Sequence, residues 1–291
     1  MKRFLMFLAA LIIILTVLYI SFAYQARPLA KHPYLSDSPL VIAHQGGERL
    51  YPSNTLYAFS QAVDMGVDML EFDIHASGDG ELVIIHDDSV DRTTDGKGLV
   101  KELSFADLKS LDAGYYWTND HGQSYPYRNK DITIPSVREV FEAFPQMPMV
   151  IEIKQQEPDI TGVFCEMLKR YQMTDKVIIG SFYDEVMANF RERCPEVITS
   201  MSEGEVRMMV ILNTLFVGDA FKPTAQVAQV PEASGNLSII NPRFISVAKQ
   251  KNIAVQAWTI NEEADMQRML GLGLDGIITD RPDLLLQLLG R

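Results

Sequence analysis

Residues 67–86 read VDMLEFDIHASGDGELVIIH, and this stretch decides how the rest of the chain is organised. Two β-like halves, 67–75 and 81–86, flank the turn Gly78-Asp79-Gly80, whose residue types supply the positive φ angles of a tight reversal. The intervening residues are too few for the crossover that parallel neighbours require. We therefore expect an antiparallel hairpin with Asp73 roughly opposite His86.

The acidic residues of this hairpin point to a metal site. Glu71 and Asp73 are two residues apart, so their side chains share one face of the strand, and His86 joins them. Burying like charges together is unfavourable unless a cation neutralises them. A half-buried strand with a solvated acidic edge is the alternative, but Glu152 supplies a third acid on a later strand, 149–154. The sequence therefore predicts that Glu71, Asp73 and Glu152 bind a divalent cation.

Composition narrows the class of protein. The 291 residues are 47% hydrophobic, enough for one large domain or two small ones. The formal net charge of −12 disfavours nucleic acid as a partner and a basic patch that docks on anionic lipid. Cys165 and Cys194 lie near the ends of predicted helices, where either a disulfide or two buried thiols is compatible with the pattern.

The N-terminus differs in kind from the rest. Residues 4–23 carry no charge and follow Lys2 and Arg3. At about 1.5 Å per residue, such a run spans the roughly 30 Å hydrocarbon core of a bilayer, and it exceeds the apolar core of about 7–15 residues in a secretory signal. We expect residues 1–23 to be an uncleaved, single-pass signal anchor and residues 24–39 a tether.

The charges that flank this run set the expected orientation. Lys2 and Arg3 favour a cytoplasmic N-terminus and an extracytoplasmic catalytic body, although Arg27 and Lys31 on the far side act against it. Small residues at Ser21, Ala23 and Ala26 leave a cleaved signal open. The oligomeric state is not readable from the sequence.

Beyond the hairpin, strand and helix alternate along the chain. This alternation predicts a parallel sheet, and the number of units favours a closed (β/α)₈ barrel over residues 40–291, with an open doubly wound sheet as the second choice. Residues 87–131 are rich in Asp, Gly and aromatic residues without periodicity, so they form an insertion. Nine segments resemble strands: 40–43, 67–75, 81–86, 149–154, 177–181, 197–200, 227–230, 253–259 and 276–279. One must lie outside a regular barrel, either the second half of the hairpin or the weak strand 227–230.

Side chains at the carboxyl ends of barrel strands meet in one mouth. His44, Lys154, Trp258 and Asp280 follow or end such strands, and join the three acids there, although Asp280 also suits the cap of the last helix. Carboxylates without cysteine or a close histidine pair favour Mg²⁺ or Ca²⁺ over zinc. His44 and His86 can divide general acid and general base roles, and Lys154 attracts an anionic substrate. Together these groups indicate metal-assisted attack at phosphorus.

Six ordered blocks resemble the glycerophosphodiester phosphodiesterase family: IAHQGG (42–47), PSNTLYAF (52–59), MLEFDIHASGDGELVIIHDDSVDRTTDGKG (69–98), IEIK (151–154), AWTINEE (257–263) and DGIITDRPD (275–283). The similarity covers residues 40–287. It implies a TIM barrel of the phosphatidylinositol-phospholipase-C-like type with a small insertion. It also implies a metal held by Glu71, Asp73 and Glu152, with His44 and His86 as acid and base.

In substrate terms, the resemblance implies a small-molecule phosphodiester, cleaved to glycerol phosphate and an alcohol. Lys154 is implied near the metal and phosphate, and Trp258 against the alcohol portion. A lysophospholipase D acting on membrane lysophospholipids and a non-catalytic phosphodiester-binding protein are the alternatives.

Two positions depart from the family pattern. Gln45 stands where the family usually has Arg, and Ser53 where it has Glu. An arginine contacts a phosphate bidentately, whereas a glutamine offers only neutral donors. We expect Gln45 to lie at the substrate site, and the paired loss leaves no stranded charge if the two positions meet in space.

Residues 206–221 are apolar almost all round the predicted helix, whereas a helix outside a barrel needs only one apolar stripe. We expect Met209 and Leu212 to face a groove for an acyl chain; burial beneath the insertion or in a dimer interface is the alternative. His75 is expected beside the site without binding the metal, and His32 and His121 on the surface.

Overall fold

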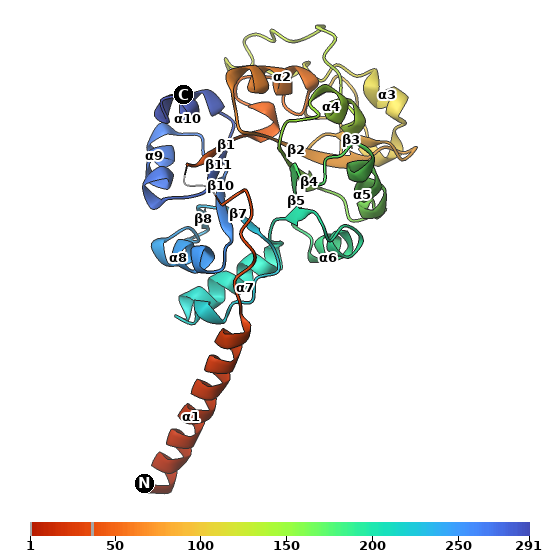
Figure 1. The fold of residues 1–291 in the computed structure, drawn as a ribbon. Coiled ribbons are helices and arrows are strands. Elements are labelled where there is room, and N and C mark those ends of the chain that lie inside the picture. Colours follow the sequence, from red (N-terminus) through yellow and green to blue (C-terminus); the bar gives the residue numbers. More distant parts are fainter. Residues whose placement is uncertain (1, 36–37) are drawn as a thin grey trace.

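A computed structural model describes residues 2–35 and 38–291. Eight parallel strands form the barrel in the order β6-β5-β4-β2-β1-β11-β10-β7 (Figure 1). Between β6 and β7 the barrel is closed by backbone hydrogen bonds, from Met201 to Val227 at 2.8 Å and from Gln226 to Thr199 at 3.2 Å. The predicted barrel is therefore confirmed, and the open sheet is wrong. The strands are β1 Leu40–Ala43, β2 Met69–Ala76, β4 Met149–Ile153, β5 Val177–Gly180, β6 Ile198–Thr199, β7 Val227–Pro231, β10 Ala254–Trp258 and β11 Gly276–Thr279.

The extra strand is β3 (Leu82–Ile84), which pairs antiparallel with β2 as the hairpin pattern predicts. The weak strand near residue 227 is a regular barrel strand instead. In the hairpin, Ile74 lies opposite Ile84, and Ile85 donates its backbone N–H to Asp73. Extended by one residue, this register places Ile85 opposite Asp73, so His86 lies beyond the end of β3 and one residue past that position.

The helices surround the barrel, and local capping explains several of their ends. Thr55 caps α2 by accepting the Ala58 N–H, and left-handed Gly66 ends that helix. The helices are α2 Leu56–Met65, α3 Phe105–Lys109, α4 Val137–Ala143, α5 Thr161–Arg170, α6 Asp184–Arg193, α7 Glu203–Thr214, α8 Pro242–Gln250, α9 Glu263–Leu272 and α10 Pro282–Leu288. Short 3₁₀ turns are η1 His44–Gly46, η2 Val100–Glu102 and η3 Gly218–Ala220, and β8 Ala233–Ser234 pairs with β9 Leu237–Ser238.

The barrel interior is filled near the amino ends of the strands. Ile42, Met69 and Ile178 pack there with side chains of β4, β7, β10 and β11, and Tyr34 from the expected tether packs against them. This packing closes one end of the barrel, so a cavity opens only toward the carboxyl ends of the strands.

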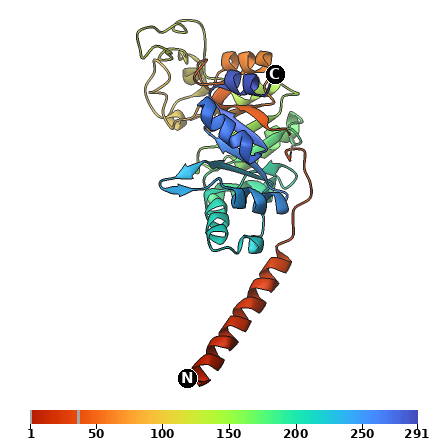
Figure 2. The same ribbon diagram turned by 90° about the vertical axis from the view of Figure 1, so that its left-hand side faces the viewer.

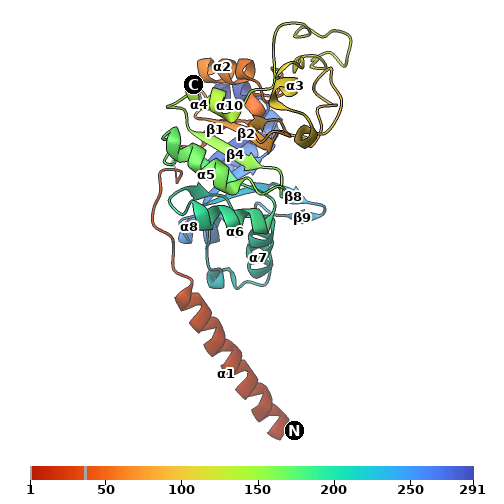
Figure 3. The same cartoon turned by 90° about the vertical axis from the view of Figure 1, so that its right-hand side faces the viewer.

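The insertion packs around a small core of its own, beside the barrel (Figure 3). Val90, Val100, Leu108 and Ile132 are buried in it, and Val83 of β3 joins them. Through β3, this small core holds the segment that carries His86.

The N-terminal helix α1 (Lys2–Gln25) projects away from the barrel in two perpendicular views (Figures 1 and 2). Its length and mean hydropathy of 2.8 suit a membrane span. The segment that follows is bound to the barrel: Leu29 donates to the Lys251 carbonyl at 3.0 Å, and Asn252 Nδ2 donates to the Leu29 carbonyl at 2.6 Å. His32 is half-buried and contacts the Asn252 carbonyl, so its prediction as a plain surface residue is wrong.

A disulfide joins Cys165 in α5 to Cys194 at the end of α6. Both residues are buried against the outer face of the barrel sheet. The bond therefore ties two neighbouring helices of the outer layer together, and the alternative of two buried thiols is wrong.

Candidate active site

One cavity of about 680 Å³ opens at the carboxyl ends of the strands. It brings together His44 after β1, Glu71 of β2, Glu152 of β4, Lys154 just beyond β4, Trp258 of β10 and His86 beyond β3. Asp73 and Gln45, also expected at the site, lie beneath this surface with 1% and 2% of their area exposed. The residues that the sequence places at one mouth are thus neighbours in space.

The three acids converge because of the strand register. In the parallel pair β2–β4, Asp73 lies opposite Glu152, and Glu71 shares the face of Asp73. One carboxylate oxygen from each lies within 4.8 Å of the others. His44, Glu48 and Asp280 form another such group, but Glu48 and Asp280 hydrogen-bond Arg92, Asn261 and His44. The group on β2 and β4 differs from it in consisting of three carboxylates, two of them buried.

Electrostatics favour a cation among the three acids. Burial and then the like charge of Asp73 raise the pKa of Glu71 to about 8. Burial raises the pKa of Glu152 too, against the opposing effect of Lys154. The Lys154 ammonium lies 2.9 Å from Glu152 and 3.1 Å from Asp73, so one positive charge contacts two of three acids. Oxygen donors with excess negative charge fit Mg²⁺ or Ca²⁺.

Gln45 holds the acids in place. Its backbone N–H donates to Glu71 Oε2 and its amide Nε2 to Asp73 Oδ2, each at 2.9 Å. Asn54 Nδ2 donates to the same Asp73 oxygen at 3.0 Å. Gln45 has a left-handed backbone, with φ of 51°, which turns both donors toward β2. Ser53 lines a separate cavity beside the insertion, so its side chain and that of Gln45 are directed to different places.

His44 is oriented by a carboxylate from the far end of the chain. Its Nδ1 lies 2.6 Å from Asp280 Oδ1, and Asn261 Nδ2 donates to the other Asp280 oxygen at 2.6 Å. The Nε2 atom is 4.0 Å from Glu71. Burial lowers the pKa of His44, but Glu71, Asp280 and Asp73 outweigh it and raise the pKa to about 9. Asp280 therefore positions the imidazole and does not cap α10.

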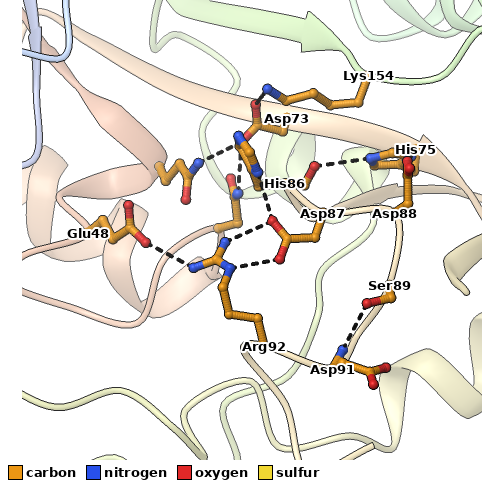
Figure 4. A network of polar contacts seen from close by, with 12 residues as sticks. Glu48, Asp73, His75, His86, Asp87, Asp88, Ser89, Asp91, Arg92 and Lys154 are labelled. Atoms are coloured by element: carbon orange, nitrogen blue, oxygen red, sulfur yellow. Dashed lines mark hydrogen bonds and ion pairs between the residues drawn. The ribbon is translucent and has the colours of Figure 1, made fainter. Parts of the chain in front are cut away.

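His86, just beyond β3, has a matching arrangement (Figure 4). Its Nδ1 lies 2.8 Å from Asp87 Oδ1, and Arg92 binds both oxygens of Asp87 at 2.7 and 3.0 Å. The Arg92 hydrogen bond is the main reason that the pKa of Asp87 falls to about 2. His75 contacts the His86 carbonyl at 3.3 Å and so supports the backbone there.

Aromatic and aliphatic side chains extend the cavity away from the acids. Trp258 and Phe182 meet edge to face, with ring centroids 5.8 Å apart. Beyond them Val206 and Val210 of α7 line the wall, with Met201, Val230, Leu237 and Ile239. Met209 is fully buried in the core instead, and Leu212 packs against that core, so the choice of these two for the groove is wrong.

Sequence reasoning missed several contributors. Phe182 follows β5, and the rule that strand ends meet at the mouth would have found it. Asp87 is adjacent to His86, which is itself a signal for an orienting carboxylate. No pattern in the sequence points to Arg92 or Asn54, because their roles depend on how loops pack.

Comparisons with known proteins agree with this geometry. A profile of the glycerophosphoryl diester phosphodiesterase family matches residues 44–284. A glycerophosphodiester phosphodiesterase of Caldanaerobacter subterraneus is 30% identical over 86% of this chain and 97% of its own length. The human lysophospholipase D GDPD1 is 28% identical over 83% of each chain. The structure of an Oleispira antarctica phosphodiesterase in complex with the product sn-glycerol-3-phosphate is 28% identical with a TM-score of 0.70, and the match covers 87% of this chain and 97% of that one.

Proposed function

Because this chain belongs to the glycerophosphoryl diester phosphodiesterase family, we propose that it hydrolyses glycerophosphodiesters to glycerol phosphate and an alcohol. The observation that carries the proposal is one cavity lined by acids, a lysine and two imidazoles that carboxylates orient. The named relatives support the same reaction class. A protein that only bound diesters would need no oriented pair of imidazoles, so we set that alternative aside.

In this proposal Glu71, Asp73 and Glu152 hold a divalent cation, Mg²⁺ or Ca²⁺. When bound, the ion supplies positive charge that offsets the charge developing on the phosphate oxygens. Lys154, in contact with two of the acids, would add a second positive charge for the same anionic group. Gln45 and Asn54 keep the Asp73 carboxylate oriented toward the ion.

His44 and His86 divide the proton transfers. Each has its Nδ1 fixed by a carboxylate, which leaves Nε2 for the substrate. One imidazole accepts the proton of the attacking water or neighbouring substrate hydroxyl, and the other donates a proton to the leaving oxygen. Trp258 packs on the alcohol portion.

The test uses the purified full-length chain and glycerophosphocholine, with products identified by phosphorus NMR. Glu152→Gln should abolish glycerol phosphate release and weaken metal binding measured by calorimetry. Glu263→Gln, an exposed carboxylate on α9, is the matched control and should behave as wild type. Unchanged metal binding and turnover in Glu152→Gln would overturn the assignment.

A second substrate class is favoured by the apolar wall of the cavity. Val206 and Val210 of α7 line the same cavity as the catalytic groups, and an acyl chain of a bound substrate would need such an apolar wall. We propose that lysophospholipids are cleaved as by a lysophospholipase D, the activity named for the human relative. Val210→Asp should reduce lysophosphatidylcholine turnover and spare glycerophosphocholine, whereas Val163→Asp on α5 should affect neither. Equal losses on both substrates would contradict the acyl-chain role.

For location, we propose that residues 1–23 remain as a single-pass anchor, that 24–39 join it to the barrel of residues 40–291, and that the barrel lies outside the cytoplasm. The disulfide supports this, since such bonds persist in oxidising compartments. Thiol labelling of Lys222→Cys in intact cells with a membrane-impermeant reagent tests the orientation. Labelling only after lysis would reverse it.

A further inference from the structure

Helix α7 connects the catalytic cavity to the anchor. At its first two turns Val206 and Val210 line the cavity. Its other end is followed by η3, against which the end of α1 packs. Figures 1 and 3 show α7 running from the barrel toward the side from which α1 projects. The helix therefore lies between the site and the expected membrane.

One face of this end of α7 is apolar and exposed. Met208, Ile211 and Leu215 recur at helical spacing, and 51%, 47% and 63% of their surfaces are exposed. Phe216 follows with 73% exposed. Among the other large apolar side chains exposed on the described part of the barrel, only Phe182 and Tyr183 are neighbours in sequence. We call Met208, Ile211, Leu215 and Phe216 the α7 apolar face.

Phe216 is presented outward by an unfavourable backbone. Its φ of 63° is left-handed, a conformation that glycine usually supplies just past a helix end. Its ring is not used for packing inside the protein. Instead the Arg243 guanidinium lies over it, 3.8 Å from the ring centroid. Neither the backbone conformation of the turn nor packing in the core therefore explains a phenylalanine at position 216.

The anchor exit is fixed beside this face. Lys251 Nζ donates to the Ala26 carbonyl, just past the end of α1, and to the Asp219 carbonyl of η3 at 2.7 Å. Ala26 is buried by these contacts. The apolar run of α1 ends near residue 23, close to these contacts. The expected membrane surface therefore lies next to η3 and the α7 apolar face.

We propose that the α7 apolar face inserts into the interfacial region of the bilayer beside the anchor. The Arg243 guanidinium at its edge is then at the level of lipid phosphates, as expected for a cation that flanks an interfacial aromatic ring. This docking orients the barrel so that the wall formed by Val206 and Val210 is continuous with the lipid surface. The inference rests on the proposed anchoring and extends the proposed use of lipid substrates.

The experiment measures depth and needs no activity. Both native cysteines are in the disulfide, so Phe216→Cys gives one labelling site on the full-length chain. A fluorophore there, in vesicles of phosphatidylcholine and phosphatidylglycerol, should be quenched several-fold more by brominated lipids than the same label at Val163→Cys on α5. Quenching is measured only on protein that floats with the vesicles. Protein that has lost its anchor stays in solution and is detected there separately. Equal quenching at both positions overturns the proposal.

A second copy of the chain is the competing occupant of this face. Quenching by lipid that disappears as the protein-to-lipid ratio rises would identify that occupant and overturn the proposal. Leu215→Ser with Phe216→Gly separates docking from folding, because glycine suits the left-handed backbone and should not lower the unfolding midpoint. This variant should lose several-fold in lysophosphatidylcholine turnover on vesicles and nothing with glycerophosphocholine. Unchanged vesicle turnover contradicts the inference, whereas loss on both substrates would point to the catalytic proposal instead.

Discussion

Metal binding by this site should be coupled to loss of a proton from Glu71. Burial and the neighbouring Asp73 raise the pKa of Glu71 to about 8 without metal. A carboxylate must be ionised to bind a cation, so below that pKa each binding event releases this proton. Well below that pKa the metal affinity should fall about tenfold per pH unit. Between pH values of about 8 and 6 the fall should be about 50-fold, because half of the carboxyl is already protonated at its pKa.

The same shift has a defined effect on stability. The pKa of Glu71 is higher in the folded chain than its ordinary value of 4.5, so the unfolded chain loses this proton first as the pH rises. In the metal-free protein, the contribution of this proton to the free energy of unfolding is fully present below that ordinary value. It should be lost as the pH rises toward 8. A bound cation removes this effect, so the increase in the unfolding midpoint on adding metal should grow with pH.

Isothermal titration calorimetry in two buffers of different ionisation enthalpy counts the released protons directly. Wild type should release about one proton or more per ion near pH 7. Glu71→Gln should bind the metal more weakly and with a flatter pH dependence, whereas Glu263→Gln on the surface should match wild type. A pH-independent affinity with no proton release would refute the reasoning.

The remaining predictions concern catalysis, positioning, the family departures and the disulfide. His44→Ala and His86→Ala should each reduce kcat on the order of 10²-fold or more, and near-normal turnover would leave that histidine a structural role. Asp280→Asn should lower turnover less than His44→Ala does. It should also lower the pKa of His44 in an NMR titration, because it removes the negative charge of Asp280 Oδ1, 2.6 Å from His44 Nδ1. An unchanged pKa would contradict this contact. Gln45→Arg should disturb the hydrogen bond to Asp73. Adding Ser53→Glu tests whether the two positions are coupled, and additive effects on the free energy of unfolding and on KM would show that they are not. Replacing Cys165 and Cys194 by Ser should lower the free energy of unfolding by about 3 kcal/mol in chemical denaturation with kcat unchanged, and no loss would mean that the bond contributes nothing.

The sequence predicts the barrel well because its strands are short apolar runs between helices of clear period. The strand at 227–230 looked weak because Gln229 interrupts it, yet Gln229 faces Gln256 and bonds it at 2.9 Å inside the barrel. The strand-like segment outside the closed barrel is instead β3, which pairs antiparallel with β2.

The positions at strand ends predicted the catalytic groups, but they did not predict the residues that hydrogen-bond and orient those groups. Asp280 reaches His44 across 236 positions of sequence, and only the closed barrel brings β1 beside β11. The packing of the predicted tether was not foreseen for the same reason, since Tyr34 fills the end of the barrel through contacts that no local pattern reveals. On α7 the uniform apolar composition hid which face was buried, and Met209 was chosen where Val210 lines the cavity.

The central claim is metal-dependent hydrolysis at the cluster of Glu71, Asp73 and Glu152. The most direct test is release of glycerol phosphate from glycerophosphocholine by the full-length chain after chelation, followed by addition of Mg²⁺ or Ca²⁺. The site geometry predicts no turnover in chelator, recovery with one of these ions, and no recovery in Glu71→Gln. Full turnover in excess chelator, or recovery in Glu71→Gln equal to wild type, would contradict it.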